Sequence, residues 1–148
     1  MTLDATAAGI DLRIVWFDND MLELRVIASN GIFVGETTFY ESFECPTNFA
    51  RSIAGFPSTS EEVRTFVMGN TNNDGLLGGV SLKFSNLDKM GHLNLEIFIH
   101  GNATEVGELT EFAKLNIPMT PADVDELVYQ LEQMKLIVGD GASIEIFR

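Results

Sequence analysis

Strict alternation of apolar and polar residues in short segments limits the fold of this chain more than any other feature of its sequence. The alternation is clearest between His92 and His100, where every second residue is aliphatic and the residues between them are mostly polar. The aliphatic residues are Leu93, Leu95, Ile97 and Ile99. A period of two is typical of a β-strand with one buried face. This segment is therefore predicted to be a strand that lies on the core.

Similar short patterns recur along the chain, and turn residues separate them. We expect further strands at residues 11–17, 21–28, 32–40, 62–68, 80–84, 108–117 and 142–147. Asn30 and Gly31 form a favourable pair for a type I′ turn and predict a hairpin between the second and third of these strands. The first ten residues are small and polar and are expected to form a flexible tail.

Two segments change to helical spacing. Residues 46–54 are predicted to be a short helix, with Pro46 in its first turn. A second helix should begin after Thr120, because Thr120 can cap it, Pro121 suits the first helical position and Asp123 can complete a capping box. Its apolar stripe consists of Val124, Leu127, Val128, Leu131 and Met134.

Consecutive strands without a strand-helix-strand rhythm exclude a parallel sheet. We therefore expect one α+β domain over residues 11–148, built on a curved, mostly antiparallel sheet of about seven or eight strands with two helices packed on one face. The other face of the sheet must be solvated, folded back on itself or used for binding. A chain of 148 residues is long enough to bury one substantial core.

The balance of charged residues limits the classes of partner that this chain can bind. Nine Lys and Arg against 22 Asp and Glu give a formal charge of −13, and the basic residues are scattered. This excludes binding to nucleic acid or to an anionic membrane surface, both of which need a basic face. No apolar run approaches the ~18 residues of a membrane span. The acidity either serves solubility alone or complements a basic protein partner.

The single cysteine and an N-terminus without the features of a signal peptide predict a cytoplasmic protein. Cys45 follows Glu44, which would raise the pKa of the thiol, so we expect a small core residue instead of a nucleophile.

Candidate catalytic and metal-binding residues do not form a usable set. His92 and His100 project from the same face of one strand but lie ~26 Å apart, and Glu96 is ~13 Å from each. We interpret both histidines as surface residues. Residues 70–75 resemble the start of a calcium loop, yet the twelfth position is Ser81 where a bidentate Glu is needed. We expect no enzymatic activity, no metal and no cofactor.

The candidate partner-binding residues are an aromatic residue on a polar strand face and the carboxylates near it. Phe98 shares the polar face of its strand with Glu96, and Ile27 is similarly placed on another strand; such residues mark either a second core layer or a contact patch. Glu105, Glu108 and Glu111 form an acidic group that is less easily explained by helix electrostatics than Asp123, Asp125 and Glu126. Glu41, Glu44, Glu61 and Glu62 could extend the group into an acidic rim.

Several segments resemble small bacterial immunity proteins that neutralise polymorphic toxins, in particular a WapI-immunity-like group. The resemblance rests on residues 35–39, on the helix that ends in Phe56 and Pro57, on residues 91–97 and on the helix at 125–134. It implies inhibition of a toxin by surface complementarity, in which an acidic face meets a basic toxin. It assigns no functional residue.

Two function classes remain open from the sequence. The first is a non-catalytic acidic protein-binding module, such as an immunity protein with a basic toxin as its partner. The second is a carrier of a small apolar ligand, because a curved sheet closed by helices can enclose a cavity that Phe and Met side chains line. A monomer and a homodimer are compatible with both.

Overall fold

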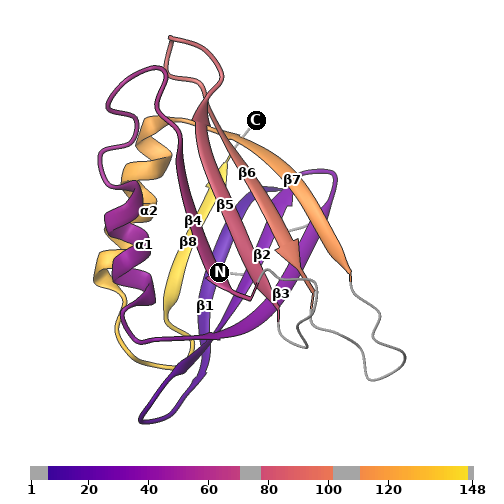
Figure 1. Ribbon diagram of the computed structural model, residues 1–148, viewed down its shortest axis with the longest axis vertical. Helices are drawn as coiled ribbons and strands as arrows, with labels where there is room; N and C mark the ends of the chain where they lie inside the picture. Colours follow the sequence, from indigo (N-terminus) through magenta and orange to yellow (C-terminus); the bar gives the residue numbers. More distant parts are fainter. Residues whose placement is uncertain (1–6, 71–77, 102–110, 147–148) are drawn as a thin grey trace.

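The α+β fold with antiparallel strands is confirmed in the computed structural model, which describes residues 7–70, 78–101 and 111–146 (Figure 1). The elements are β1 (Ala8–Phe17), β2 (Leu22–Asn30), β3 (Val34–Glu41), α1 (Cys45–Ile53), β4 (Arg64–Gly69), β5 (Gly79–Asn86), β6 (Leu93–His100), β7 (Phe112–Met119), α2 (Pro121–Gln133) and β8 (Gly141–Ile146). Every strand pair is antiparallel.

The strands divide between two sheets instead of forming the single sheet that the sequence predicts. The first sheet has the order β3-β2-β1-β8, and the second has the order β4-β5-β6-β7. In Figure 1 the second sheet lies in front of the first. The sheet has therefore folded back on itself, because alternating strands must bury one apolar face and two such faces bury each other.

The core lies between the two sheets. Leu12, Leu24 and Phe39 reach it from the first sheet, and Leu82 and Ile97 reach it from the second. On β6 the predicted aliphatic residues are all buried, with exposed fractions of 0 to 2%, so the alternation identified the core face of this strand correctly.

The two helices close one side of the space between the sheets, at the left of Figure 1. α1 lies against β4, α2 lies against β8, and the helices contact each other. The rings of Phe49 in α1 and Phe66 in β4 stack with their centroids 5.0 Å apart. Apolar residues of both helices belong to the same core as the sheets, so this side of the fold is buried.

The start of α2 has the predicted capping box. The Thr120 hydroxyl accepts a hydrogen bond from the backbone N–H of Asp123 at 3.3 Å, and the Asp123 carboxylate accepts one from the backbone N–H of Thr120 at 2.8 Å. Val124, Leu127 and Leu131 are fully buried, whereas Val128 and Met134 are partly buried. α2 thus begins where its capping residues predict and docks through its apolar stripe.

The β2–β3 hairpin turns one residue later than predicted. The backbone N–H of Asn30 donates to Phe33, so the central residues are Gly31 and Ile32. Gly31 has a φ of +90°. The side-chain oxygen of Asn30 accepts the N–H groups of Ile32 and Phe33, which holds the turn. β3 therefore starts at Val34 instead of residue 32, and β1 starts at Ala8, ahead of the expected residue 11.

The two sheets are joined at β3. The hydroxyl of Thr37 donates to the backbone oxygen of His100 at 2.6 Å, and the Glu41 carboxylate accepts the N–H of Gly69 at 2.8 Å. Gly69 has a φ of +69°, and a Cβ there would lie 2.6 Å from the Cβ of Phe39. This close approach requires glycine at position 69.

Within the described residues, neither helix is long and apolar enough to cross a membrane.

Candidate functional site

The outer face of the second sheet carries a group of stacked rings. Phe98 on β6 points outward, and its ring stacks on that of Phe112 with centroids 5.1 Å apart and planes 17° apart. The ring of His100 lies 4.7 Å from that of Phe98. The register places His100 directly opposite Phe112, which explains how residues far apart in the sequence meet. We call Phe98, His100 and Phe112 the aromatic surface.

A second exposed apolar group lies at the tip of the β2–β3 hairpin. Ile32, Phe33 and Val34 are 75%, 65% and 48% exposed, and Phe112 is 66% exposed. Apolar side chains this exposed are unfavourable unless something covers them. We call residues 32–34 the hairpin tip.

A groove connects the hairpin tip with the aromatic surface. It has a volume of about 230 Å³ and lies between the start of β3 and the start of β7. Its described lining residues are Val34, Gly35, Glu36, Ile99, Gly101, Glu111, Phe112 and Ala113. Two of the lining residues carry carboxylates, four are apolar, and none of them is basic.

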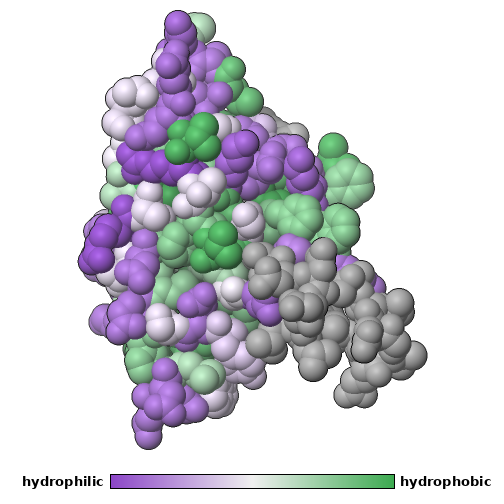
Figure 2. All heavy atoms as spheres, in the orientation of Figure 1, coloured by the Kyte–Doolittle hydropathy of each residue, from purple (hydrophilic) through white to green (hydrophobic). Residues whose placement is uncertain are grey.

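Figure 2 looks onto this side of the molecule. Green apolar spheres gather at the right of the view, over β6, β7 and the end of the β2–β3 hairpin. Val34 of the hairpin tip and Phe112 of the aromatic surface both line the groove, so these three features adjoin one another.

The residues predicted to bind a partner are partly collected here. Phe98 is at the centre of the aromatic surface, and Glu96 lies beside it on β6, where Lys114 of β7 approaches it to 3.8 Å. Glu111 is exposed at the edge of the groove, and its backbone oxygen accepts the N–H of Gly101 at 2.8 Å. Glu105 and Glu108 lie outside the described residues.

Two carboxylates of the proposed rim have structural partners elsewhere. Glu62 accepts hydrogen bonds from Ser58, which together with Arg64 lower the pKa of its carboxyl group. Glu41 accepts the N–H of Gly69 where β3 meets the second sheet. Both carboxylates are thus engaged in hydrogen bonds within the chain.

The two histidines differ in their surroundings. His92 is exposed, and its Nδ1 lies 2.5 Å from a carboxylate oxygen of Asp88; this hydrogen bond is the main cause that lowers the pKa of Asp88. His100 is half-buried and belongs to the aromatic surface, so it is not an isolated surface residue. In the three described ranges, no three His, Cys, Asp or Glu side chains gather as metal ligands would.

Cys45 is a buried core residue, as the sequence predicts, and is 3% exposed. Its thiol pKa is raised to about 12, first by burial and second by the charge of Glu41. The neighbouring Glu44, which the sequence suggested as the cause, is not the residue responsible. A thiol with this pKa is protonated at neutral pH and is not a nucleophile.

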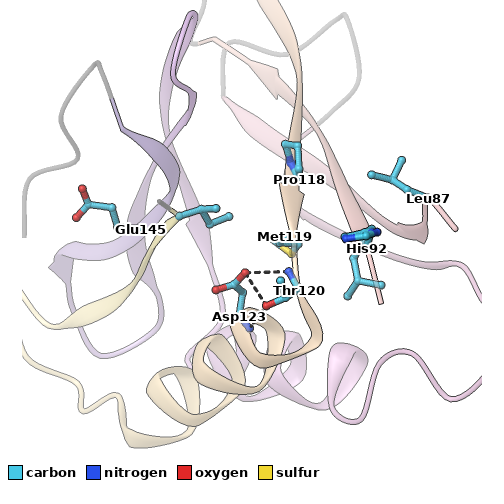
Figure 3. Close-up of a pocket in the computed structure, with 9 residues that line it drawn as sticks. Leu87, His92, Pro118, Met119, Thr120, Asp123 and Glu145 are labelled. Atoms are coloured by element: carbon cyan, nitrogen blue, oxygen red, sulfur yellow. Dashed lines mark hydrogen bonds between the residues drawn. The ribbon is translucent and has the colours of Figure 1, made fainter. Parts of the chain in front are cut away.

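A larger hollow of about 470 Å³ opens where the end of β7 faces the end of β8 (Figure 3). It is lined by Leu87, His92, Leu93, Pro118, Met119, Thr120, Asp123, Glu145 and Ile146. In Figure 3, the Asp123 carboxylate accepts hydrogen bonds from the backbone N–H and the hydroxyl of Thr120, so these polar groups already have partners in the capping box. The Glu145 carboxylate points away from the other labelled residues. The remaining lining is mostly apolar.

Comparisons of the chain with protein-family models, with curated proteins and with solved structures gave no match. The candidate site therefore has to be interpreted from its own geometry.

Sequence reasoning missed Phe112 and the hairpin tip. The signal for Phe112 was present, because it alternates with Lys114 and Asn116 on the polar side of the expected strand, as Phe98 does on its own strand. The signal for the tip was the run Ile32, Phe33 and Val34 directly after a turn, since an alternating strand cannot bury three consecutive residues.

Proposed function

We propose that this protein is a non-catalytic binding module whose protein partner docks on the aromatic surface, the groove and the hairpin tip. The observation that carries the proposal is the exposed stack of Phe98 on Phe112, continuous through the groove with three further exposed apolar residues. Aromatic side chains are enriched at the centres of protein interfaces, because they bury a large area at a small cost in conformational entropy.

The partner is a basic protein. The chain carries a formal charge of −13, and the groove presents Glu36 and Glu111 without a basic residue among its described lining residues. Opposite charges accelerate encounter and select against acidic competitors, whereas the rings supply most of the binding energy. A basic toxin, which the resemblance to immunity proteins implies, is a partner of this chemistry, and occlusion of its active site would be the mode of inhibition.

The test is the capture of partners from a lysate of the source cells by the wild-type chain and by the double variant Phe98→Ser, Phe112→Ser. We expect a basic protein that binds the wild type, binds more weakly as the salt concentration rises, and loses at least about 30-fold in affinity for the double variant, which is the effect of removing a hot spot of about 2 kcal/mol. The affinities are measured by calorimetry with the purified partner.

The matched control is Tyr129→Ser, which removes an aromatic side chain that is 59% exposed on α2. It should leave the affinity unchanged. The proposal fails if no partner is captured even at low salt, or if the captured protein binds the double variant and the wild type equally well.

The hollow between β7 and β8 supports a second candidate, a carrier of a small apolar ligand. Its volume of about 470 Å³ lies within the range of small-molecule sites, and Leu93, Met119 and Ile146 give it an apolar wall. Native mass spectrometry of the purified protein should then detect a bound molecule that the variant Met119→Lys does not retain. A mass equal to that of the bare chain would remove this candidate.

A further inference from the structure

We propose that the free edge of β7 binds an extended segment of the basic partner by β-strand addition. The inference rests on the proposed binding function and specifies how the partner is held. The incoming strand would become the fifth strand of the second sheet, with its side chains continuing the aromatic surface on one side of the sheet.

The register of the β6–β7 pair determines which backbone groups are available. Gly101 donates to the oxygen of Glu111, so this is a hydrogen-bonded pair, and every second pair along the antiparallel ladder is of the same type. The residues between these pairs, Phe112, Lys114 and Asn116, therefore direct their N–H and C=O groups away from β6. Within the described residues these groups have no backbone partner.

Each of the other three edge strands is bound to another element of the chain at one position or more. At β8, the Gln130 amide of α2 binds both backbone groups of Ser143, donating to its oxygen at 3.0 Å and accepting its N–H at 2.7 Å. β4 lies beside α1, and the N–H of Gly69 at the end of β4 donates to the Glu41 carboxylate at 2.8 Å. β3 is bound to the second sheet through Thr37. β7 is the edge strand that carries Phe112 of the aromatic surface, and this directs strand addition to β7.

A second copy of the chain is a poor occupant of this edge. The symmetric register that uses all three outward-facing residues places Lys114 opposite Lys114 of the other copy, and like charges directly opposite each other destabilise a strand pair. Each copy also carries a charge of −13. Pro118 has no N–H group to donate at the end of the edge, and a charged lysine within an edge strand is a known protection against self-association.

The groove specifies the charge of the incoming segment. A strand that pairs with Phe112 would continue toward the groove, whose lining includes Glu36 and Glu111 together with the apolar side chains of Ile99 and Ala113. A lysine or arginine side chain suits this position, because its aliphatic stem can pack on the apolar lining residues while its cationic head meets the carboxylates. Opposite Phe112 the segment should carry an apolar side chain.

The probe for this inference is a displayed library of random peptides of about ten residues, the length of a strand with its flanks. Peptides are selected on the intact chain and tested on the variant Lys114→Pro, which removes one outward N–H without removing a bond to β6. We expect peptides that alternate apolar residues and carry a Lys or Arg at one end, slow the hydrogen exchange of the amides of Phe112, Lys114 and Asn116, and bind the variant at least about tenfold more weakly.

Because Lys114→Pro could disturb the fold, each selected peptide is also synthesised with its alternate backbone nitrogens methylated and is tested on the wild-type chain. Methylation in the paired register should weaken binding about tenfold or more, and methylation in the other register should not. Strand addition is overturned if no peptide is selected, if the three amides keep their exchange rates, if neither methylation matters, or if light scattering shows a dimer that Lys114→Pro dissociates.

These outcomes are separate from the test of the proposed function. A partner that requires Phe98 and Phe112 but binds Lys114→Pro and the wild type equally would retain the binding surface and reject strand addition. If the partner binds the wild type, the Phe98→Ser, Phe112→Ser variant and Lys114→Pro equally well, both the binding surface and strand addition are rejected.

Discussion

β8 and β7 are both edge strands, so each has backbone N–H and C=O groups that no neighbouring strand binds. The two strands differ in whether another part of the chain binds these groups. At β8, Gln130 reaches from α2 and satisfies both backbone groups of Ser143. At β7, the outward groups of Phe112, Lys114 and Asn116 have no such partner in the described part of the chain. One amide side chain can thus satisfy both outward backbone groups of an edge residue, and β7, which has no such contact in the described residues, carries Phe112 of the aromatic surface.

The ion pair near β8 is shorter and more buried than the ion pair at β7. Asp11 on β1, next to β8, is 1% exposed and receives two hydrogen bonds from Arg13, at 2.6 and 3.3 Å. The hydrogen bonds with Asp11 are the largest cause of the raised pKa of Arg13. Arg13 also donates to the backbone oxygen of Gly139. Glu96 and Lys114 at the β7 side lie 3.8 Å apart, with the Lys114 side chain exposed and the Glu96 side chain half-buried. The buried pair should therefore contribute more to the stability of the fold than the exposed pair.

The largest expected effect is that of Arg13→Met. The substitution leaves the buried Asp11 carboxylate without its cationic partner, so it should lower the free energy of unfolding by about 3 kcal/mol. The double variant Asp11→Leu, Arg13→Met should regain most of this loss, because no buried charge is left unpaired. Denaturation in urea measures both values.

The matched variant at the other edge is Lys114→Met, which should change the free energy of unfolding by less than about 0.5 kcal/mol. Equal losses for Arg13→Met and Lys114→Met would contradict the distinction between the two ion pairs.

The two edges should also differ in hydrogen exchange. The amide of Ser143 is held by Gln130 and should exchange at least about 100-fold more slowly than the amides of Phe112, Lys114 and Asn116, which are hydrogen-bonded to nothing in the described chain. Exchange followed by NMR on the free protein measures each amide separately. Similar exchange rates for the amide of Ser143 and the three β7 amides would contradict the difference between the two edges, because they would mean that the β7 amides are protected in the free protein.

Gln130→Met should lower the free energy of unfolding by about 2 kcal/mol. It removes both hydrogen bonds to Ser143 and keeps a side chain of similar length, so the loss reports the unpaired backbone groups. Gln133→Met on the exposed side of α2 is the control and should cost less than about 0.5 kcal/mol. If the two glutamine variants are equally stable, the β8 edge is not sealed by Gln130.

The smallest expected effect concerns Asp88, in the turn before β6. Its pKa is lowered mainly by the hydrogen bond with His92, so the pair contributes stability above the unfolded pKa of about 4, and this contribution is lost as the pH falls through the lower folded value. NMR titration should show the Asp88 carboxyl group titrating below an ordinary aspartate, and His92→Ala should return it toward the ordinary value. An unchanged titration in His92→Ala would assign the shift to the backbone N–H groups of the turn.

Local patterns predicted much of the fold because the causes are local. The capping box at Thr120 and Asp123 involves residues three positions apart, and the aliphatic face of β6 repeats every second residue. Of the candidate site, the sequence identified Phe98 and Glu96 as an unusual pair on a polar strand face. It could not identify Phe112 as the stacking partner, because the stack depends on the β6–β7 register.

The sequence by itself thus determined the antiparallel strands, the two helices and the start of α2, since period, turn residues and caps act over a few positions. The tertiary structure alone decided that the strands form two sheets, that Gln130 meets Ser143, and that Phe98, Phe112 and the hairpin tip lie together. A period of two states which side chains share a face, but it does not state which strand or side chain lies opposite. The composition gives the net charge of the chain but not where the acidic residues lie. Only the fold brings Glu36 and Glu111 to one groove.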